Sequence, residues 1–163
     1  MQDNQRLQSN KNTRVYMAAI ISSLMLVFSL NAQANHDISK NYNGNVIGGF
    51  DAVAYFTMGE AVMGSSDIST EWLGGKWLFV NEQHRELFLA DPGKYIPQYG
   101  GYCSVSSSFG RHGSANPRSW QIVDGKLYLF YNKATFDGWE VHYSSTQAAD
   151  KKWEKAKAGL LQQ

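Results

Sequence analysis

Two segments of this chain place aromatic and aliphatic residues on both sides of a tight glycine turn, and this pattern restricts the fold more than any other feature. The first segment runs from Thr70 to Val80 around Gly74-Gly75. The second runs from Trp120 to Phe130 around Asp124-Gly125. Two-residue turns need backbone conformations with positive φ, which glycine adopts easily. The sequence therefore predicts two antiparallel β-hairpins.

A helix is expected after each hairpin. Asn81 is a suitable N-cap for a helix over Glu82–Ala90, which the following Asp91-Pro92 ends. After the second hairpin, the stretch from Thr135 to about Tyr143 is also expected to be helical. Apolar residues at helical spacing predict a last helix from about Thr146 to Leu160.

The order of a hairpin followed by a capped helix thus occurs twice. This repetition hints at an internal repeat, although a shared use of the same turn residues explains it as well. The expected fold class is α+β: a small single domain of antiparallel β-hairpins with short helices and a C-terminal helix. The five tryptophans and the many other aromatic residues supply its core.

The first 34 residues have the order of a signal peptide. Basic residues precede a nearly uninterrupted apolar stretch, Val15–Leu30, which is followed by Ala32-Gln33-Ala34. We expect cleavage after Ala34 and a periplasmic or secreted protein; an uncleaved membrane anchor is the alternative. Residues 35–48 are polar and are expected to form a flexible lead into a domain that spans residues 49–163.

The charge of the mature chain argues against binding to nucleic acids. The leader holds three of the 15 basic residues and one of the 14 acidic ones, so the mature chain has a formal net charge of −1. Proteins that bind the phosphate backbone are usually basic. A nucleic-acid partner is therefore not expected. The expected partner is a metal ion or a small molecule, with membrane contact only through an uncleaved leader.

The chain has one cysteine, Cys103. A single thiol in an exported protein cannot form an internal disulfide, so it is buried, bound to a metal, paired with another molecule or used in redox chemistry. The preceding residues Tyr99, Gly100, Gly101 and Tyr102 are candidates for the wall of a ligand pocket beside it.

A long Ser-, Gly- and Asn-rich stretch, Ser104–Pro117, follows Cys103 and is expected to be a loop. His112 lies on it, and the loop could fold back to form a Cys-His pair that lowers the pKa of the thiol or binds a metal. A solvent-exposed histidine is the alternative for His112, as an inert buried thiol is for Cys103.

The chain resembles the YHS domain, and in particular the exported subgroup described as YHS domain-containing (seleno)proteins. The residues that carry this resemblance are Asp51–Tyr55, Glu71–Phe79, Phe88–Tyr95, Gly100–Cys103 and Trp120–Leu129. The family includes modules found beside metal-transporting ATPases. The resemblance therefore implies a connection with metal handling.

The resemblance also shows what this chain lacks. Metal-binding members carry cysteines at positions where this chain has Ala54 and Val80, and His84 alone keeps a metal ligand at a former cysteine position. A closed tetrahedral zinc site needs four such ligands. Some members of the subgroup are thought to hold selenocysteine, and Cys103 is the natural counterpart, which implies redox or soft-metal use.

Three functions follow as hypotheses. The first is an exported module that binds a soft metal ion such as copper through Cys103, with His112 or His84, because thiolate and imidazole ligands suit Cu(I). The second is a thiol-dependent redox protein that needs an external thiol. The third is a non-catalytic binding scaffold with an inert Cys103. No catalytic motif is visible, so the sequence favours a protein that is not an enzyme.

Overall fold

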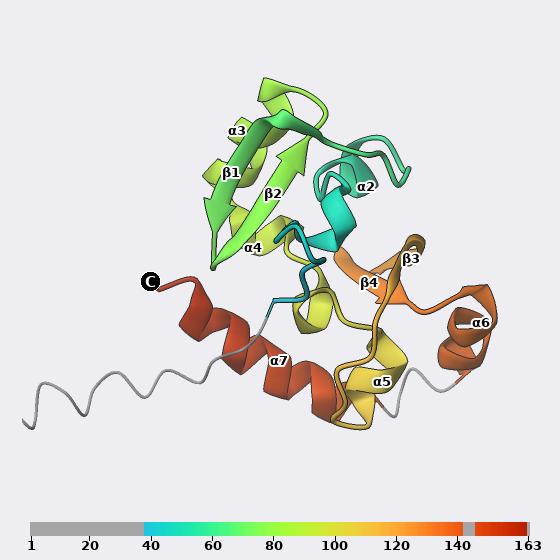
Figure 1. The fold of residues 1–163 in the computed structure, drawn as a ribbon. Helices are drawn as coiled ribbons and strands as arrows, with labels where there is room; N and C mark the ends of the chain where they lie inside the picture. The colour runs from blue at the N-terminus through green and yellow to red at the C-terminus, as the bar shows by residue number, and fades with distance from the viewer. Residues whose placement is uncertain (1–37, 142–145, 163) are drawn as a thin grey trace, which may run out of the picture. The chain divides into compact units, whose positions relative to one another are not determined.

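The computed structural model describes residues 38–141 and 146–162, and it confirms the α+β fold class (Figure 1). The signal-peptide prediction for residues 1–34 lies outside the described residues. Two antiparallel hairpins, several short helices and a C-terminal helix make up the domain. The elements in order are η2 (Ile47–Gly49), α2 (Ala54–Thr57), β1 (Ser65–Trp72), β2 (Gly75–Phe79), α3 (Glu82–Ala90), α4 (Pro92–Tyr95), η3 (Gln98–Gly101), α5 (Ser104–Ser108), β3 (Asn116–Val123), β4 (Lys126–Phe130), α6 (Lys133–Val141) and α7 (Gln147–Leu160).

The first hairpin forms as predicted, but its turn is one residue earlier than expected. Leu73 and Gly74 are the turn residues, with φ of 51° and 67°, and Gly75 already pairs with Trp72 in the ladder. Gly75 is needed for another reason: a Cβ atom there would lie 2.4 Å from Cγ2 of Val46. The glycine predicted as a turn residue therefore allows a neighbouring segment to lie against the strand.

The helices that follow the two hairpins agree closely with the prediction. Helix α3 has the predicted bounds, and the Asn81 side chain accepts a hydrogen bond from the backbone N–H of His84 at 2.8 Å. In the same way, Asn132 accepts a hydrogen bond from the N–H of Thr135 at 2.9 Å, so α6 begins two residues before its predicted start. Its predicted end near Tyr143 lies outside the described residues.

The two hairpin–helix units are structural copies of each other. Each residue of the second hairpin has a number 51 higher than that of its counterpart in the first hairpin. The pair Val123–Lys126 thus corresponds to the pair Trp72–Gly75, and both ladders contain a register shift at the same place. Helices α3 and α6 have equivalent bounds and nine residues each. The buried aromatic residues on them, Phe88 and Trp139, pack on equivalent strand residues. The structure therefore favours the internal repeat.

The repeat also extends upstream of the hairpins. Ile47, Gly48 and Gly49 have positive φ one after another, as do Tyr99, Gly100 and Gly101. A short helix follows each of these two glycine turns, α2 in the first half and α5 in the second. The second half thus has a helix, α5, in the stretch expected to be a continuous loop, where three consecutive serines had obscured the helical pattern.

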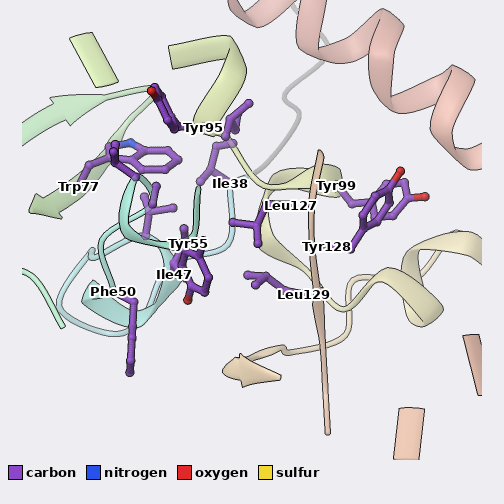
Figure 2. Close-up of a cluster of buried hydrophobic side chains, with 14 of the residues drawn as sticks. Ile38, Ile47, Phe50, Tyr55, Trp77, Tyr95, Tyr99, Leu127, Tyr128 and Leu129 are labelled. Atoms are coloured by element: carbon purple, nitrogen blue, oxygen red, sulfur yellow. The ribbon is translucent and has the colours of Figure 1, made fainter. Parts of the chain in front are cut away.

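One core joins both halves. Figure 2 shows Tyr55 and Trp77 from the first half in the same buried cluster as Leu127 and Tyr128 from the second. Ile38 also belongs to this cluster. The lead over residues 35–48 was expected to be flexible, yet its described part is packed: Ile38 and Val46 are buried, and Val46 pairs with the backbone of Lys76.

No helix among the described residues is long and apolar enough to cross a membrane.

Candidate functional site

Cys103 lies at the junction between η3 and α5. Its side chain is 2% exposed, and its backbone N–H donates a hydrogen bond to the carbonyl of Gly113 at 2.9 Å. It also forms an isolated parallel bridge with Leu129 of β4. Cys103 is a free, buried cysteine.

The loop after α5 folds back towards Cys103. Besides the bond between Gly113 and Cys103, the exposed His112 ring stacks on Tyr102, with ring centroids 4.6 Å apart and planes at 14°. Gly113 allows this close approach, because a Cβ atom there would lie 2.3 Å from Oγ of Ser106. The loop thus brings His112 beside the residue next to Cys103, with its ring on Tyr102 instead of on the thiol.

The four predicted pocket residues form a tight buried turn. Tyr99, Gly100 and Gly101 are buried, and Tyr102 is partly exposed. The Tyr99 ring packs near Tyr128, and its hydroxyl donates a hydrogen bond to the Asp150 carboxylate of α7. These contacts give the turn a clear packing role.

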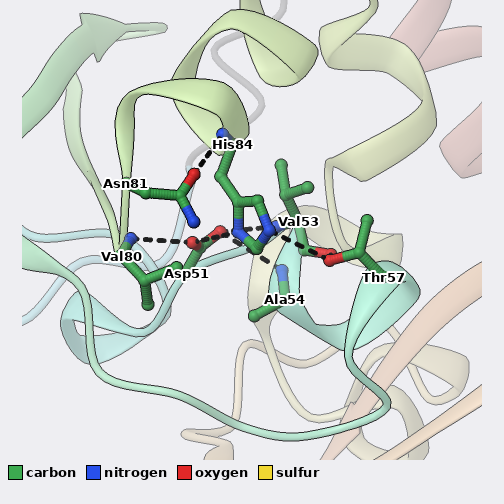
Figure 3. Close-up of polar contacts among 7 residues, drawn as sticks. All are labelled: Asp51, Val53, Ala54, Thr57, Val80, Asn81 and His84. Carbon is green, nitrogen blue, oxygen red and sulfur yellow. Dashed lines mark hydrogen bonds and ion pairs between the residues drawn. The ribbon is translucent and has the colours of Figure 1, made fainter.

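His84 belongs to a different cluster, centred on Asp51 (Figure 3). The Asp51 side chain is fully buried, and its Oδ1 accepts hydrogen bonds from the N–H groups of Val53 and Ala54 at 2.8 and 3.3 Å. Its Oδ2 accepts from the N–H of Val80 at 2.9 Å and from Nδ1 of His84 at 2.7 Å. One carboxylate therefore ties α2, the end of β2 and α3 together.

The other side of the His84 ring faces a hydroxyl. Nε2 of His84 lies 3.2 Å from Oγ1 of Thr57, which also lies 3.0 Å from the carbonyl of Val53. Both ring nitrogens of His84 are thus engaged. Over residues 38–141 and 146–162, no group of three or more His, Cys, Asp or Glu side chains has an arrangement that could hold a metal ion.

Tyr55 lies beside this cluster. Its hydroxyl donates a hydrogen bond to the carbonyl of Pro117 at 2.9 Å, which links α2 to the start of β3. Burial raises the pKa of Tyr55 well above its ordinary value, the Asp51 carboxylate raises it further, and Arg118 opposes the shift.

Sequence reasoning missed the polar cluster, although it singled out Asp51 and His84 separately. They are 33 positions apart, and nothing in the spacing indicates that they meet. The available signal was a lone aspartate before the apolar run Ala52–Tyr55, a position that suits a carboxylate capping a short helix.

No family model, no curated protein and no solved structure matches this chain.

Proposed function

We propose that the exported domain binds one soft metal ion, Cu(I), through Sγ of Cys103, with the His112 imidazole as the second ligand. The observation that supports this proposal most is the folded-back loop. It anchors Gly113 to Cys103 and holds the neighbouring His112 ring against Tyr102. Thiolate and imidazole are ligands that Cu(I) accepts readily.

Binding requires a local change at the surface. The His112 ring is exposed, so it can leave its stack on Tyr102 without disturbing the core. Gly110 and Gly113 flank His112 in the loop and give the backbone the freedom to turn it towards the thiol. The buried position of Cys103 would shield a bound cuprous ion from water and external thiols.

His84 is not part of the proposed site. Asp51 and Thr57 already engage its two ring nitrogens, so binding a metal would break a buried hydrogen bond.

The test is competition for Cu(I) against a chromogenic chelator under anaerobic conditions. Wild-type protein should retain one equivalent, and Cys103→Ser should retain none. His112→Phe keeps an aromatic ring to stack on Tyr102 but removes the nitrogen ligands, so its affinity should fall at least about tenfold. Equal retention by wild type and Cys103→Ser would reject the proposal.

A binding scaffold with an inert Cys103 is the second candidate, and the 2% exposure of the side chain favours it. The two candidates differ in the behaviour of the thiol. If the scaffold is correct, Cu(I) will not protect Cys103 from alkylation by iodoacetamide. Metal binding predicts that one equivalent of Cu(I) protects it.

A further inference from the structure

In the Asp51 cluster, a carboxylate, an imidazole and a hydroxyl lie next to one another in that order. Asp51 holds Nδ1 of His84 at 2.7 Å, and Nε2 on the opposite side of the ring lies 3.2 Å from Oγ1 of Thr57. Because both oxygens of Asp51 accept backbone N–H bonds, Nδ1 of His84 is the donor to this carboxylate. Nε2 can then accept the Thr57 proton. This is the arrangement of an orienting group, a base and a nucleophile.

Burial decreases along this cluster towards the surface. Asp51 is fully buried, His84 is 6% exposed, and Thr57 is an exposed residue at the end of α2. Figure 3 shows the His84 ring between Asp51 and Thr57. The orienting carboxylate is therefore buried, while the residue that carries the hydroxyl lies at the surface.

The second half of the domain shows that the fold does not require this cluster. The same hairpin and helix form there with Thr135 at the position equivalent to His84, and the Thr135 hydroxyl donates a hydrogen bond to Oδ1 of the Asn132 cap. Cys103 takes the place of Asp51 after the positive-φ turn. A buried acid–imidazole pair is also a weak source of stability compared with apolar packing. The architecture that the two halves share therefore does not require this pair, which leaves it available for chemistry.

We propose that Asp51, His84 and Thr57 form an acyl-transfer site that accepts small activated esters. Oγ1 of Thr57 attacks the carbonyl carbon while its proton passes to Nε2 of His84. The bond from that carbon to the leaving oxygen breaks, and the leaving group takes the proton from His84. Water then attacks the Thr57 ester with His84 as the base and restores the hydroxyl, so that no other reactant is needed.

The carbonyl of Val53 competes for the Thr57 proton. The hydroxyl lies at hydrogen-bond distance from both acceptors, and rotation of its hydrogen alone directs the proton to Nε2 of His84. A base within this distance of a hydroxyl typically accelerates proton transfer steps by about 10²- to 10⁴-fold.

The probe is p-nitrophenyl acetate, with acetylated peptides quantified by mass spectrometry. Wild type and Thr57→Ser should show acetylation of the hydroxyl at position 57 and a burst of p-nitrophenol, and Thr57→Val should show neither. In His84→Gln, acetylation at Thr57 should be at least about a hundredfold slower. The hydroxyl of Thr135 is the internal control, because it bonds to an amide and not to an imidazole.

Thr57→Val leaves the bond between Asp51 and His84 in place, so it keeps the test valid if His84→Gln does not fold. Near-ultraviolet circular dichroism verifies the fold of each variant. Acetylation of Thr57 no faster than that of Thr135, or a p-nitrophenol burst of equal size in wild type and Thr57→Val, would overturn the proposal. Binding of Cu(I) at Cys103 is measured separately and does not bear on this result.

Discussion

Asp51 and Cys103 occupy equivalent positions in the two halves of one domain. Each lies two residues after the last glycine of a positive-φ turn. Each donates its backbone N–H to a carbonyl at 2.9 Å, that of Val62 for Asp51 and that of Gly113 for Cys103. The same backbone site therefore carries a carboxylate with four hydrogen-bond donors in one half and a free thiol in the other.

Removing the Asp51 carboxylate should be strongly destabilising. Asp51→Ala leaves Nδ1 of His84 and the N–H of Val80 without their acceptor in a buried site. The expected loss in the free energy of unfolding is about 3–5 kcal/mol, measured by urea denaturation. As a control, Glu82→Gln removes an exposed ion pair with Arg85 and should cost less than about 1 kcal/mol.

A double variant extends this prediction. Asp51→Cys combined with His84→Thr copies the residues of the second half and leaves no unpaired imidazole. The double variant should lose less free energy of unfolding than the two single variants together, by about 0.5–3 kcal/mol, because the two side chains are in contact. Additive losses would show that the two residues act independently.

Gly113→Ala should loosen the loop over Cys103. The added methyl group would lie 2.8 Å from Cβ of Ser106, so the loop must move, at a cost of about 1–3 kcal/mol. We expect a faster reaction of Cys103 with a disulfide reagent such as DTNB than in wild type. Gly159→Ala is the matched control: it lies in α7 with no atom near its added methyl group, and it should raise stability by up to about 1 kcal/mol. An unchanged thiol reaction rate in Gly113→Ala would contradict this account of the loop.

Tyr55 should make the domain sensitive to alkaline pH. Because its pKa is higher in the folded state than in the unfolded state, folding retains a proton that the unfolded chain loses above its ordinary pKa of about 10. The contribution of Tyr55 is complete below that pH and decreases as the pH rises, by about 1.4 kcal/mol per unit. Denaturation between pH 9 and 11, a range set about the ordinary tyrosine value, should show a steeper loss for wild type than for Tyr55→Phe. At neutral pH, Tyr55→Phe should lose only about 1 kcal/mol, from the bond to Pro117.

The predictable parts of this fold are those that depend on local sequence. The Asp124-Gly125 turn and the cap at Asn81 each act over a few residues, and the structure has both where they were expected. The first turn was predicted one residue too late because Gly74 and Gly75 are adjacent in the sequence. Only the close approach of Val46 to Gly75 shows which glycine belongs to the strand. That contact is tertiary and leaves no mark in the local pattern.

The candidate sites were less predictable, for the same reason. His112 could be placed on a loop that returns towards Cys103, but not on the face of Tyr102. The contact between Asp51 and His84 depends on how α3 packs on the first hairpin. The internal repeat is visible in the equal pairing registers of the two hairpins, and not in identical residues. A search for identical residues does not detect such a relationship.

A domain made of two similar halves presents the same backbone position twice. While one half maintains the architecture, the residue at the equivalent backbone position of the other half can change. A carboxylate and a thiol can thus be tried at the same geometric point without inventing a new fold. The two halves therefore offer protein engineers two places in one small domain at which to introduce functional groups.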